Sequence, residues 1–316
     1  MRDELAEVKT KKTEFLDQIN RLVPWGKWVE IIEPYYYKGE RGNKPYDLEL
    51  MLRIYILQNL YDLGDMAMMT EVIDSRAFSH FCEVESSNQI PDGDTIGRFR
   101  NMLTENHLQK RLFDDLVAAL QEQGLILRKG TIVDSTLIAS SPSTKNKAHT
   151  RDPEAHQSKK GKNWYFGYKA HIGADRDTGI VHHLETTPGN NSDVGEVSKL
   201  LTGDEETVHG DSGYTGAEKR EDAIRKNREG RKIRYRINKR RSAIDPGPGW
   251  KHGQQKRRER EKSSVRAKVE HVFGIVKRQF RYRKTRYRGL VKTAAAHYMK
   301  FALANLILAD RCSLAA

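Results

Sequence analysis

Three acidic residues stand in settings where a carboxylate is uncommon. Asp134 interrupts the apolar, β-branched run TIVDSTL at 131–137, and Asp211 follows another apolar run in VHGDSGY. Glu270 is the only acid between residues 263 and 290, a stretch with nine lysines and arginines. A carboxylate in or at the end of a buried strand costs several kcal/mol unless it is paired, hydrogen-bonded or bound to a metal. Each of the two aspartates therefore needs a partner.

The chemistry that such carboxylates perform together is the binding of oxygen-preferring metal ions. Two or three of them can hold a pair of Mg²⁺ ions, which activate an attacking water or 3′-hydroxyl and stabilise the leaving oxygen of a phosphodiester. Simpler interpretations remain open for each acid alone. Either aspartate could form an Asx turn or cap, and Glu270 could form a surface pair with Arg266 one helical turn away.

The segment around Glu270 has the periodicity of a helix. At 100° per residue its apolar side chains fall within about 40° of one line, and this predicted buried face consists of Val265, Val269, Val272, Phe273, Val276 and Phe280. Arg266, Glu270 and Lys277 form a stripe along the edge of that face. The sequence therefore predicts that Glu270 lies where the helix meets both the rest of the fold and an outside ligand.

The positive charge of the chain is local. Residues 225–288 hold 25 lysines and arginines against five acids, a net charge of +20, whereas the whole chain of 316 residues carries +13. Such a concentration is typical of a surface that binds a polyanion. A solvated basic tail is the alternative, but the tyrosines and apolar residues that interrupt the charges favour a folded region. The basic segment is thus the predicted phosphate-binding part.

The elements that must position these acids change in type at Gly130. Residues 1–128 are predicted to be helical, and a helix-turn-helix-like unit over 66–103 is compatible with the spacing without being required by it. From residue 130 the predicted order is β-β-β-α-β-α-β-α-α, with a β-hairpin turning at 176–179. In this interpretation 141–163 is a long polar loop, 217–230 a charged helix, and the residues around 245–255 a polar linker.

Bulk features exclude several classes of protein. No apolar run approaches the about 20 residues of a membrane helix, and the first residues lack the apolar core of a signal peptide. The two cysteines, Cys82 and Cys312, have no metal-type spacing and suggest a reducing compartment. We therefore expect a cytoplasmic, nucleoid-associated protein.

Several stretches taken together resemble a known family. TIVDSTLI, STKNKAHTRDPEAHQSKKGKNWYFGYKAHIG, HGDSGYTG and SVRAKVEHVFGIVKRQF are similar to the bacterial insertion-sequence DDE transposases, in particular the InsH-like group of the insertion-sequence-five family. The wider family carries the signature Tyr-x2-Arg-x3-Glu-x6-Lys. Arg266, Glu270 and Lys277 match this spacing, whereas Ser263 stands at the tyrosine position.

The resemblance implies a ribonuclease-H-like catalytic core of class α/β with a mixed sheet, an N-terminal all-helical domain and a C-terminal helix. The expected domains are 1–128, for recognition of DNA ends, and 129–316, for catalysis. The resemblance also implies that Asp134, Asp211 and Glu270 are both the catalytic residues and the metal ligands, with Mg²⁺ (two ions, or Mn²⁺) as cofactor.

The expected substrate is double-stranded DNA, both the terminal inverted repeats of a transposon and the target, bound by a homo-oligomer. Arg266 and Lys277 are expected to contact phosphates. Lys169 and His171, at alternate positions of a strand beside Asp134, are two further candidates for DNA contact, with solvent-facing strand residues as the alternative. A nuclease of the same fold without strand transfer, and a DNA-binding protein without catalysis, are the rival functions.

Overall fold

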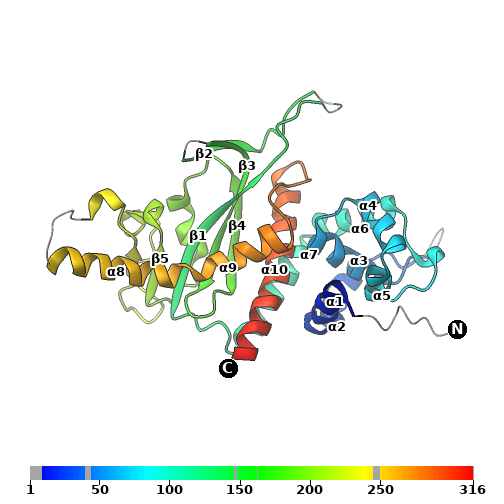
Figure 1. The fold of residues 1–316 in the computed structure, drawn as a ribbon, viewed down its shortest axis with the longest axis horizontal. Coiled ribbons are helices and arrows are strands. Elements are labelled where there is room, and N and C mark those ends of the chain that lie inside the picture. The colour runs from blue at the N-terminus through cyan, green and yellow to red at the C-terminus, as the bar shows by residue number, and fades with distance from the viewer. Residues whose placement is uncertain are drawn as a thin grey trace. The chain divides into compact units, whose positions relative to one another are not determined.

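A computed structural model describes residues 9–39, 44–145, 147, 149–161, 163–244 and 250–315. The chain forms two compact units, 1–113 and 114–316, and each is described by itself (Figure 1). Among the described residues, none of the helices is both long enough and apolar enough to cross a membrane.

Unit 1 is helical, as the sequence predicts. It contains α1 (Lys11–Leu22), α2 (Trp25–Ile32), α3 (Leu48–Tyr61), α4 (Asp65–Asp74), α5 (Arg76–Cys82), α6 (Gly93–Glu105) and the start of α7 (Leu108–Glu122), with short 3₁₀ segments η2 (Glu33–Tyr35) and η3 (Ser87–Gln89). Helix α3 begins at the cap Asp47, whose side chain accepts from the Leu50 amide at 3.0 Å. Most side chains of α3 are buried, so this helix forms the centre of the unit.

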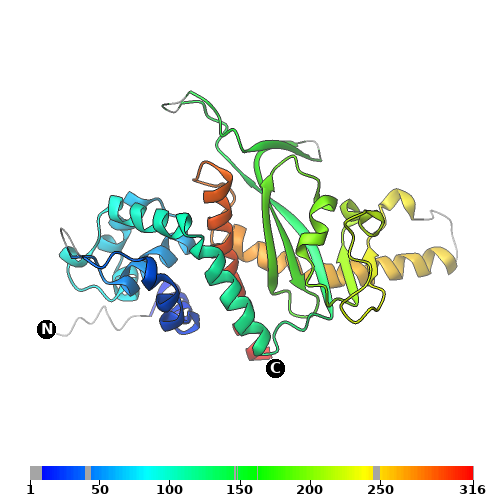
Figure 2. The same ribbon diagram turned by 180° about the vertical axis from the view of Figure 1, so that it is seen from behind.

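Unit 2 is built on a mixed six-stranded sheet (Figures 1 and 2). The strands are β1 (Gly130–Ala139), β2 (His156–Lys160), β3 (Asn163–Asp175), β4 (Val181–Pro188), β5 (Thr207–Gly210) and β6 (Arg234–Ile237). Strand β3 pairs antiparallel with β1, β2 and β4, while β1, β5 and β6 run parallel. Apart from β2 the order is therefore β4-β3-β1-β5-β6, which is the ribonuclease-H-like arrangement expected from the sequence.

Different elements cover the two faces of the sheet. On one face Val133 and Val208 pack with Val197 and Leu200 of the 3₁₀ segment η4 (Asp193–Leu200). On the other face α9 (Lys268–Gly274) packs on β1, and α10 (Leu290–Ala315) packs on β3 and β4. Because successive residues of a strand point to opposite faces, Asp134 lies on the face covered by α9.

Three elements differ from the sequence prediction. The polar segment 141–163 contains strand β2, because residues 156–160 pair with β3. Within 217–230 only the 3₁₀ segment η6 (Ala217–Lys219) is helical, because the rest turns back on itself: Asn227 donates to the carbonyl of Arg231 and Ile233 donates to that of Arg225, both at 2.9 Å. The predicted linker is shorter than expected, because α8 (Trp250–Arg266) already begins at Trp250.

The helix around Glu270 is real but interrupted. Helix α8 ends at Arg266, α9 follows from Lys268, and a π-helical turn, η8 (Ile275–Gln279), continues the chain. Val269, Val272 and Val276 are buried, which confirms the predicted apolar face. The π turn arises where Phe280 donates its amide to the carbonyl of Ile275, five residues earlier, at 2.9 Å.

Candidate active site

Asp134 occupies the middle of β1, the strand between β3 and β5. Its Oδ1 accepts from the Ser135 amide at 2.8 Å, and its Oδ2 accepts from Nη1 of Arg266 at 3.1 Å. The side chain is only 15% exposed. Burial raises the pKa of Asp134 to about 6, against the opposing effects of the Ser135 amide and the Arg266 charge. The fold therefore keeps this carboxylate buried, although burial disfavours its charged form.

Asp211 is the first residue after β5, the strand that pairs in parallel with β1. Its side chain caps the following 3₁₀ segment η5 (Ser212–Tyr214) by accepting from the Gly213 amide at 2.8 Å. The negative charge of Asp211 also contributes to raising the pKa of Asp134, so the two carboxylates influence each other. The sequence placed both aspartates in or beside strands, and the sheet makes those strands neighbours.

Glu270 lies in the first turn of α9 and is exposed, while its neighbour Val269 packs inward. Across the part of the chain that the structure describes, no three His, Cys, Asp or Glu side chains are grouped closely enough to hold a metal ion. The structure therefore places Arg266 in contact with Asp134, and Asp211 near enough for its charge to act on Asp134. It leaves Glu270 on the surface of the adjoining helix, four residues after Arg266.

Arg266 and Lys277 both contact β1 from the helical side. Arg266 contacts the carboxylate of Asp134, and Nζ of Lys277 donates to the carbonyl of Leu137 at 2.9 Å. Both side chains are partly buried in these contacts. Two positive charges thus lie along the strand that carries Asp134.

Lys169 and His171 lie on the opposite face of the sheet from Asp134. They pair with Leu137 and Ser135, whereas Asp134 pairs with Ile172. The side chain of His171 is fully buried and shares a 2.8 Å hydrogen bond with Thr187, and burial lowers its pKa to about 4. Nζ of Lys169 donates to Asp193 at 2.9 Å. Both side chains hold η4 against the sheet, so this geometry gives no support to their expected contact with DNA.

The end of α8 is fixed to the edge strand β6 by contacts that sequence reasoning missed. Nδ2 of Asn238, the residue after β6, donates to Glu259 at 3.1 Å and to Ser263 at 3.2 Å, and Lys262 donates to the carbonyl of Ile237 at 2.8 Å. Ser263, at the position where the wider family has tyrosine, thus serves as an acceptor in this junction. The one feature of the sequence that indicates this junction is the helical spacing of residues 259, 262 and 263.

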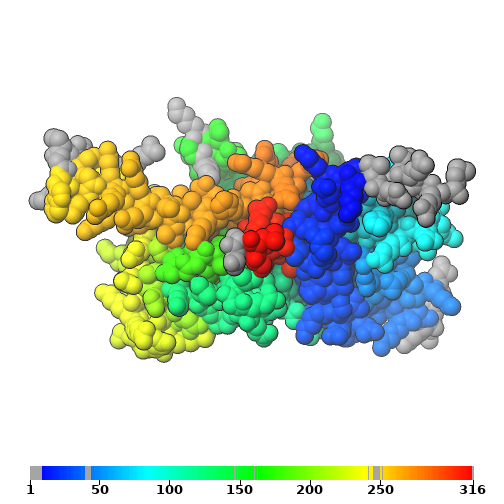
Figure 3. All heavy atoms as spheres, turned by 60° about the horizontal axis from the view of Figure 1, so that its bottom comes forward, coloured from blue at the N-terminus to red at the C-terminus, as the bar shows by residue number. Residues whose placement is uncertain are grey.

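The rest of α8 presents cations to solvent. Lys256, Arg257, Arg258 and Arg260 are exposed, and Figure 3 shows this helix, in yellow and orange, at the surface of its unit. In Figures 1 and 2 the helix continues past β5 and beyond the edge of the sheet. These side chains form a basic surface on the same helix whose last residue, Arg266, contacts Asp134.

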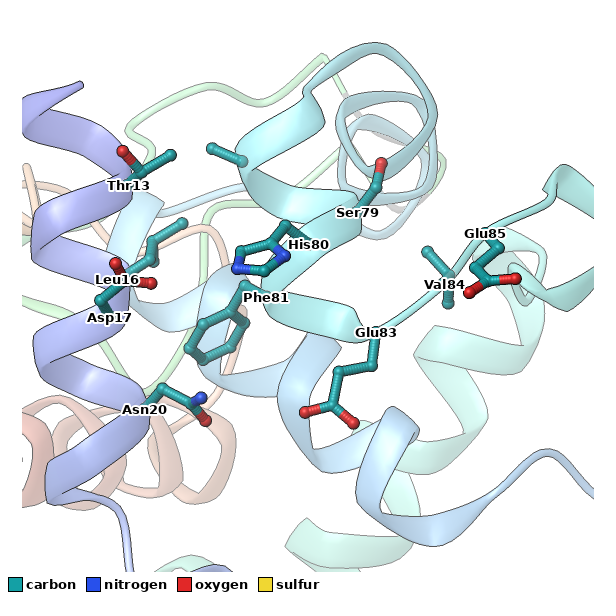
Figure 4. A pocket seen from close by; sticks show the side chains of 11 residues that line it. Thr13, Leu16, Asp17, Asn20, Ser79, His80, Phe81, Glu83, Val84 and Glu85 are labelled. Carbon is teal, nitrogen blue, oxygen red and sulfur yellow. The ribbon is translucent and has the colours of Figure 1, made fainter. Parts of the chain in front are cut away.

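In contrast to the basic helix α8, unit 1 contains a cavity with acidic side chains in its lining. A cavity of about 310 Å³ lies between α1 and α5, and Asp17, Glu83 and Glu85 are among its lining residues (Figure 4). His80 and Phe81 line it from α5. Glu83 is paired with Arg53, while Asp17 and Glu85 add negative charge that repels phosphate groups, so this cavity does not favour the DNA backbone.

A mixed sheet with coupled carboxylates beside a basic helix is the construction of an enzyme that acts on nucleic-acid phosphodiesters. Comparison with known families agrees: residues 127–306 match the Transposase DDE domain, and residues 3–102 match a second transposase domain (DUF772). The first match covers more than half of the chain, which therefore belongs to the DDE transposase family. It is a DNA transposase, a metal-dependent enzyme that cleaves DNA and transfers strands. No solved structure matches the chain.

Proposed function

We propose that Asp134, Asp211 and Glu270 hold the divalent metal of this transposase, as two Mg²⁺ ions. The observation that carries the proposal is the carboxylate of Asp134, which stays largely buried in the central strand although burial raises its pKa to about 6. A fold tolerates such a cost where the group has a function. The donor chemistry fits, because all three residues supply the oxygen ligands that Mg²⁺ prefers.

The chain's own residues have distinct roles in this proposal. When bound, the metal supplies activation of the attacking hydroxyl and neutralisation of the leaving oxygen. Asp134 and Asp211 provide ligands from adjacent strands. Glu270 is exposed on α9 and has to approach the two aspartates to provide a third. Arg266 and Lys277 contact phosphates that flank the scissile one, and the exposed cations of α8 hold the backbone further away.

The proposed substrate is the pair of terminal inverted repeats of an insertion sequence, in line with the resemblance to the insertion-sequence-five family. The enzyme frees 3′-hydroxyl ends, and these attack target DNA at the same site. Residues 1–128 take part in recognising the ends, and the active form is a homo-oligomer assembled on DNA. The DUF772 match over residues 3–102 supports a transposition-specific role for this part.

The test is cleavage of duplexes that carry the ends of the element, with Mg²⁺ present. We expect Asp134→Asn, Asp211→Asn and Glu270→Gln each to reduce cleavage and strand transfer by at least about 10³-fold, because several kcal/mol of transition-state stabilisation is lost. Binding of the ends should stay within about threefold of wild type.

Glu261→Gln is the matched control, because Glu261 is an exposed acid on α8 outside the proposed site. It should cut at the wild-type rate. A triad variant that does the same would remove that residue from the proposed ligand set.

A further inference from the structure

The first half of β3 leaves the body of the sheet together with β2. Residues 163–167 of β3 pair with β2, whereas pairing with β1 reaches only from Asp175 to Gly167, and pairing with β4 begins at Tyr168. Residues 156–161 and 163–167 therefore form a two-stranded ribbon, which we call the β2–β3 ribbon. Figures 1 and 2 show it beyond the end of β4.

One face of the ribbon carries aromatic rings and cations. Trp164 and Phe166 share a face because they are two residues apart, and Trp164 is 64% exposed. Nζ of Lys159 lies 5.7 Å from the centre of the Trp164 ring, and the guanidinium of Arg151 lies 5.9 Å from that of Phe166. An exposed indole with cations beside it is available to stack on a flat ligand.

This aromatic face lies on the same side of β3 as the face of the sheet that carries Asp134. Trp164 and Phe166 have the same parity along β3 as Ile172, which is the partner of Asp134 in β1. Paired residues of antiparallel strands point to the same side. Eight residues separate Ile172 from Trp164, a reach of about 27 Å at most along the strand. Tyr168 and Ile172 between the two are buried, so DNA that contacts both the carboxylates and the ribbon must pass outside the elements that cover β3.

The base of the ribbon is held firmly. The buried carboxylate of Asp152 accepts from the hydroxyl of Tyr168 at 2.6 Å and from the amide of Gly289 at 2.9 Å. At Gly167 the backbones are so close that a Cβ would lie 2.1 Å from the carbonyl oxygen of Ile138. A firm base below an exposed ring means that little conformational entropy is lost when a ligand stacks on the ring.

We propose that the aromatic face of the β2–β3 ribbon stacks on an unpaired nucleobase of the DNA strand that reaches the active site, with Lys159 and Arg151 beside the adjoining phosphates. The inference rests on the proposed function and adds a binding site to it. Flat aromatic rings flanked by cations are the usual platform for unpaired bases. At 3.4 Å per nucleotide, the strand length of about 27 Å corresponds to about eight nucleotides, which sets the scale of the separation between the contacted base and the scissile phosphate.

The test compares two single-stranded probes in fluorescence anisotropy: a 20-nucleotide oligodeoxythymidine and an oligonucleotide of equal length in which all bases are absent. We expect Trp164→Ala to weaken binding of the thymidine probe by about 5- to 150-fold, the range for loss of one stacked base. The abasic probe should change less than twofold. Trp164→Phe should retain most of the affinity, because the aromatic face remains.

Tyr165→Ala is the matched control, because Tyr165 lies on the other face of the same ribbon and is 37% exposed; it should bind both probes as wild type does. A single 5-iodouracil in the thymidine probe should photocrosslink to Trp164, as read by mass spectrometry. Equal losses on both probes, no loss on either, or crosslinks elsewhere only would overturn the proposal.

The outcome is independent of cleavage. An enzyme that cuts DNA through the three carboxylates while Trp164→Ala binds normally refutes the ribbon alone. An enzyme whose carboxylate variants still cut, but whose thymidine binding depends on Trp164, refutes the proposed ligands alone.

Discussion

The two units carry charges of opposite sign. Unit 1 has 15 lysines and arginines against 19 acids, a net charge of −4, whereas unit 2 has 41 against 24, a net charge of +17. Attraction to the DNA backbone is therefore concentrated in the catalytic unit. If the N-terminal part recognises DNA ends, as we propose, it does so through a few local contacts with bases or shape rather than through its overall field.

Particular cations of the two units also differ in their surroundings. In unit 1, Arg53 and Arg100 are directed inward, Arg53 to Glu49 and Glu83, Arg100 to Asp65. In unit 2, the cations of α8 reach solvent. A buried arginine contributes to the stability of its own fold, while an exposed one is available to a ligand. Measurements of DNA binding and of unfolding free energy for variants of each unit test this contrast.

The largest expected effect is on the salt dependence of DNA binding. If about six phosphates are neutralised, affinity for duplex DNA should fall by about 10³-fold between 50 and 200 mM salt. Lys256, Arg257 and Arg260 changed together to Gln should flatten this dependence, because three exposed cations of unit 2 are lost. The measurement is a titration of duplex of unrelated sequence at several salt concentrations.

The matched variant changes three exposed cations of unit 1, Arg21, Lys38 and Arg98, to Gln. It should leave the salt dependence on unrelated duplex nearly unchanged. If the two triple variants weaken binding equally, the assignment of backbone attraction to unit 2 fails.

A smaller effect, on stability, is expected at Arg53. Its guanidinium donates to the carbonyl of Phe81 at 2.8 Å and to Asn20 at 3.0 Å, and it lies 4.3 Å from the centre of the Trp25 ring. Arg53→Met should lower the free energy of unfolding by about 2–4 kcal/mol, because it removes a buried hydrogen-bonded charge that joins α1, α3 and α5. Urea unfolding followed by circular dichroism measures it.

Arg98→Met is the control within the same unit, because Arg98 is exposed on α6; it should change the unfolding free energy by less than about 0.5 kcal/mol. A loss below 1 kcal/mol at Arg53 would mean that this arginine does not hold the helices together.

Much of the fold follows from local pattern. The apolar run around Asp134 predicted β1, and the turn at 176–179 predicted the β3–β4 hairpin, because strand residues and turn residues are distinct in type. Strand β2 could not be found in this way. Its residues are polar, and it is a strand only because β3 extends past the sheet and offers a partner, which is a tertiary effect.

The candidate site was predictable only in part. The helical stripe of Arg266, Glu270 and Lys277 follows from spacing, and two of its members do reach β1. Lys169 and His171 show the limit: alternation places both on one face of β3, but only the pairing register decides which face that is. The break at Ala267 and the π turn after Gly274 likewise depend on packing against the sheet, so the orientation of Glu270 could not be derived from an ideal helix.

The smallest expected effect concerns a single exposed cation of α8. Arg257 lies 3.9 Å from Glu261 and both side chains are mostly exposed, so this pair contributes little to stability. If Arg257 neutralises one phosphate, Arg257→Gln should reduce the slope of log affinity against log salt by about 0.9 and weaken binding about fivefold near 150 mM salt. Glu261→Gln should keep the slope and bind slightly more tightly, because it removes a repelling charge. An unchanged slope in Arg257→Gln would place the DNA away from this part of α8 and confine the phosphate contacts of unit 2 to the residues next to β1.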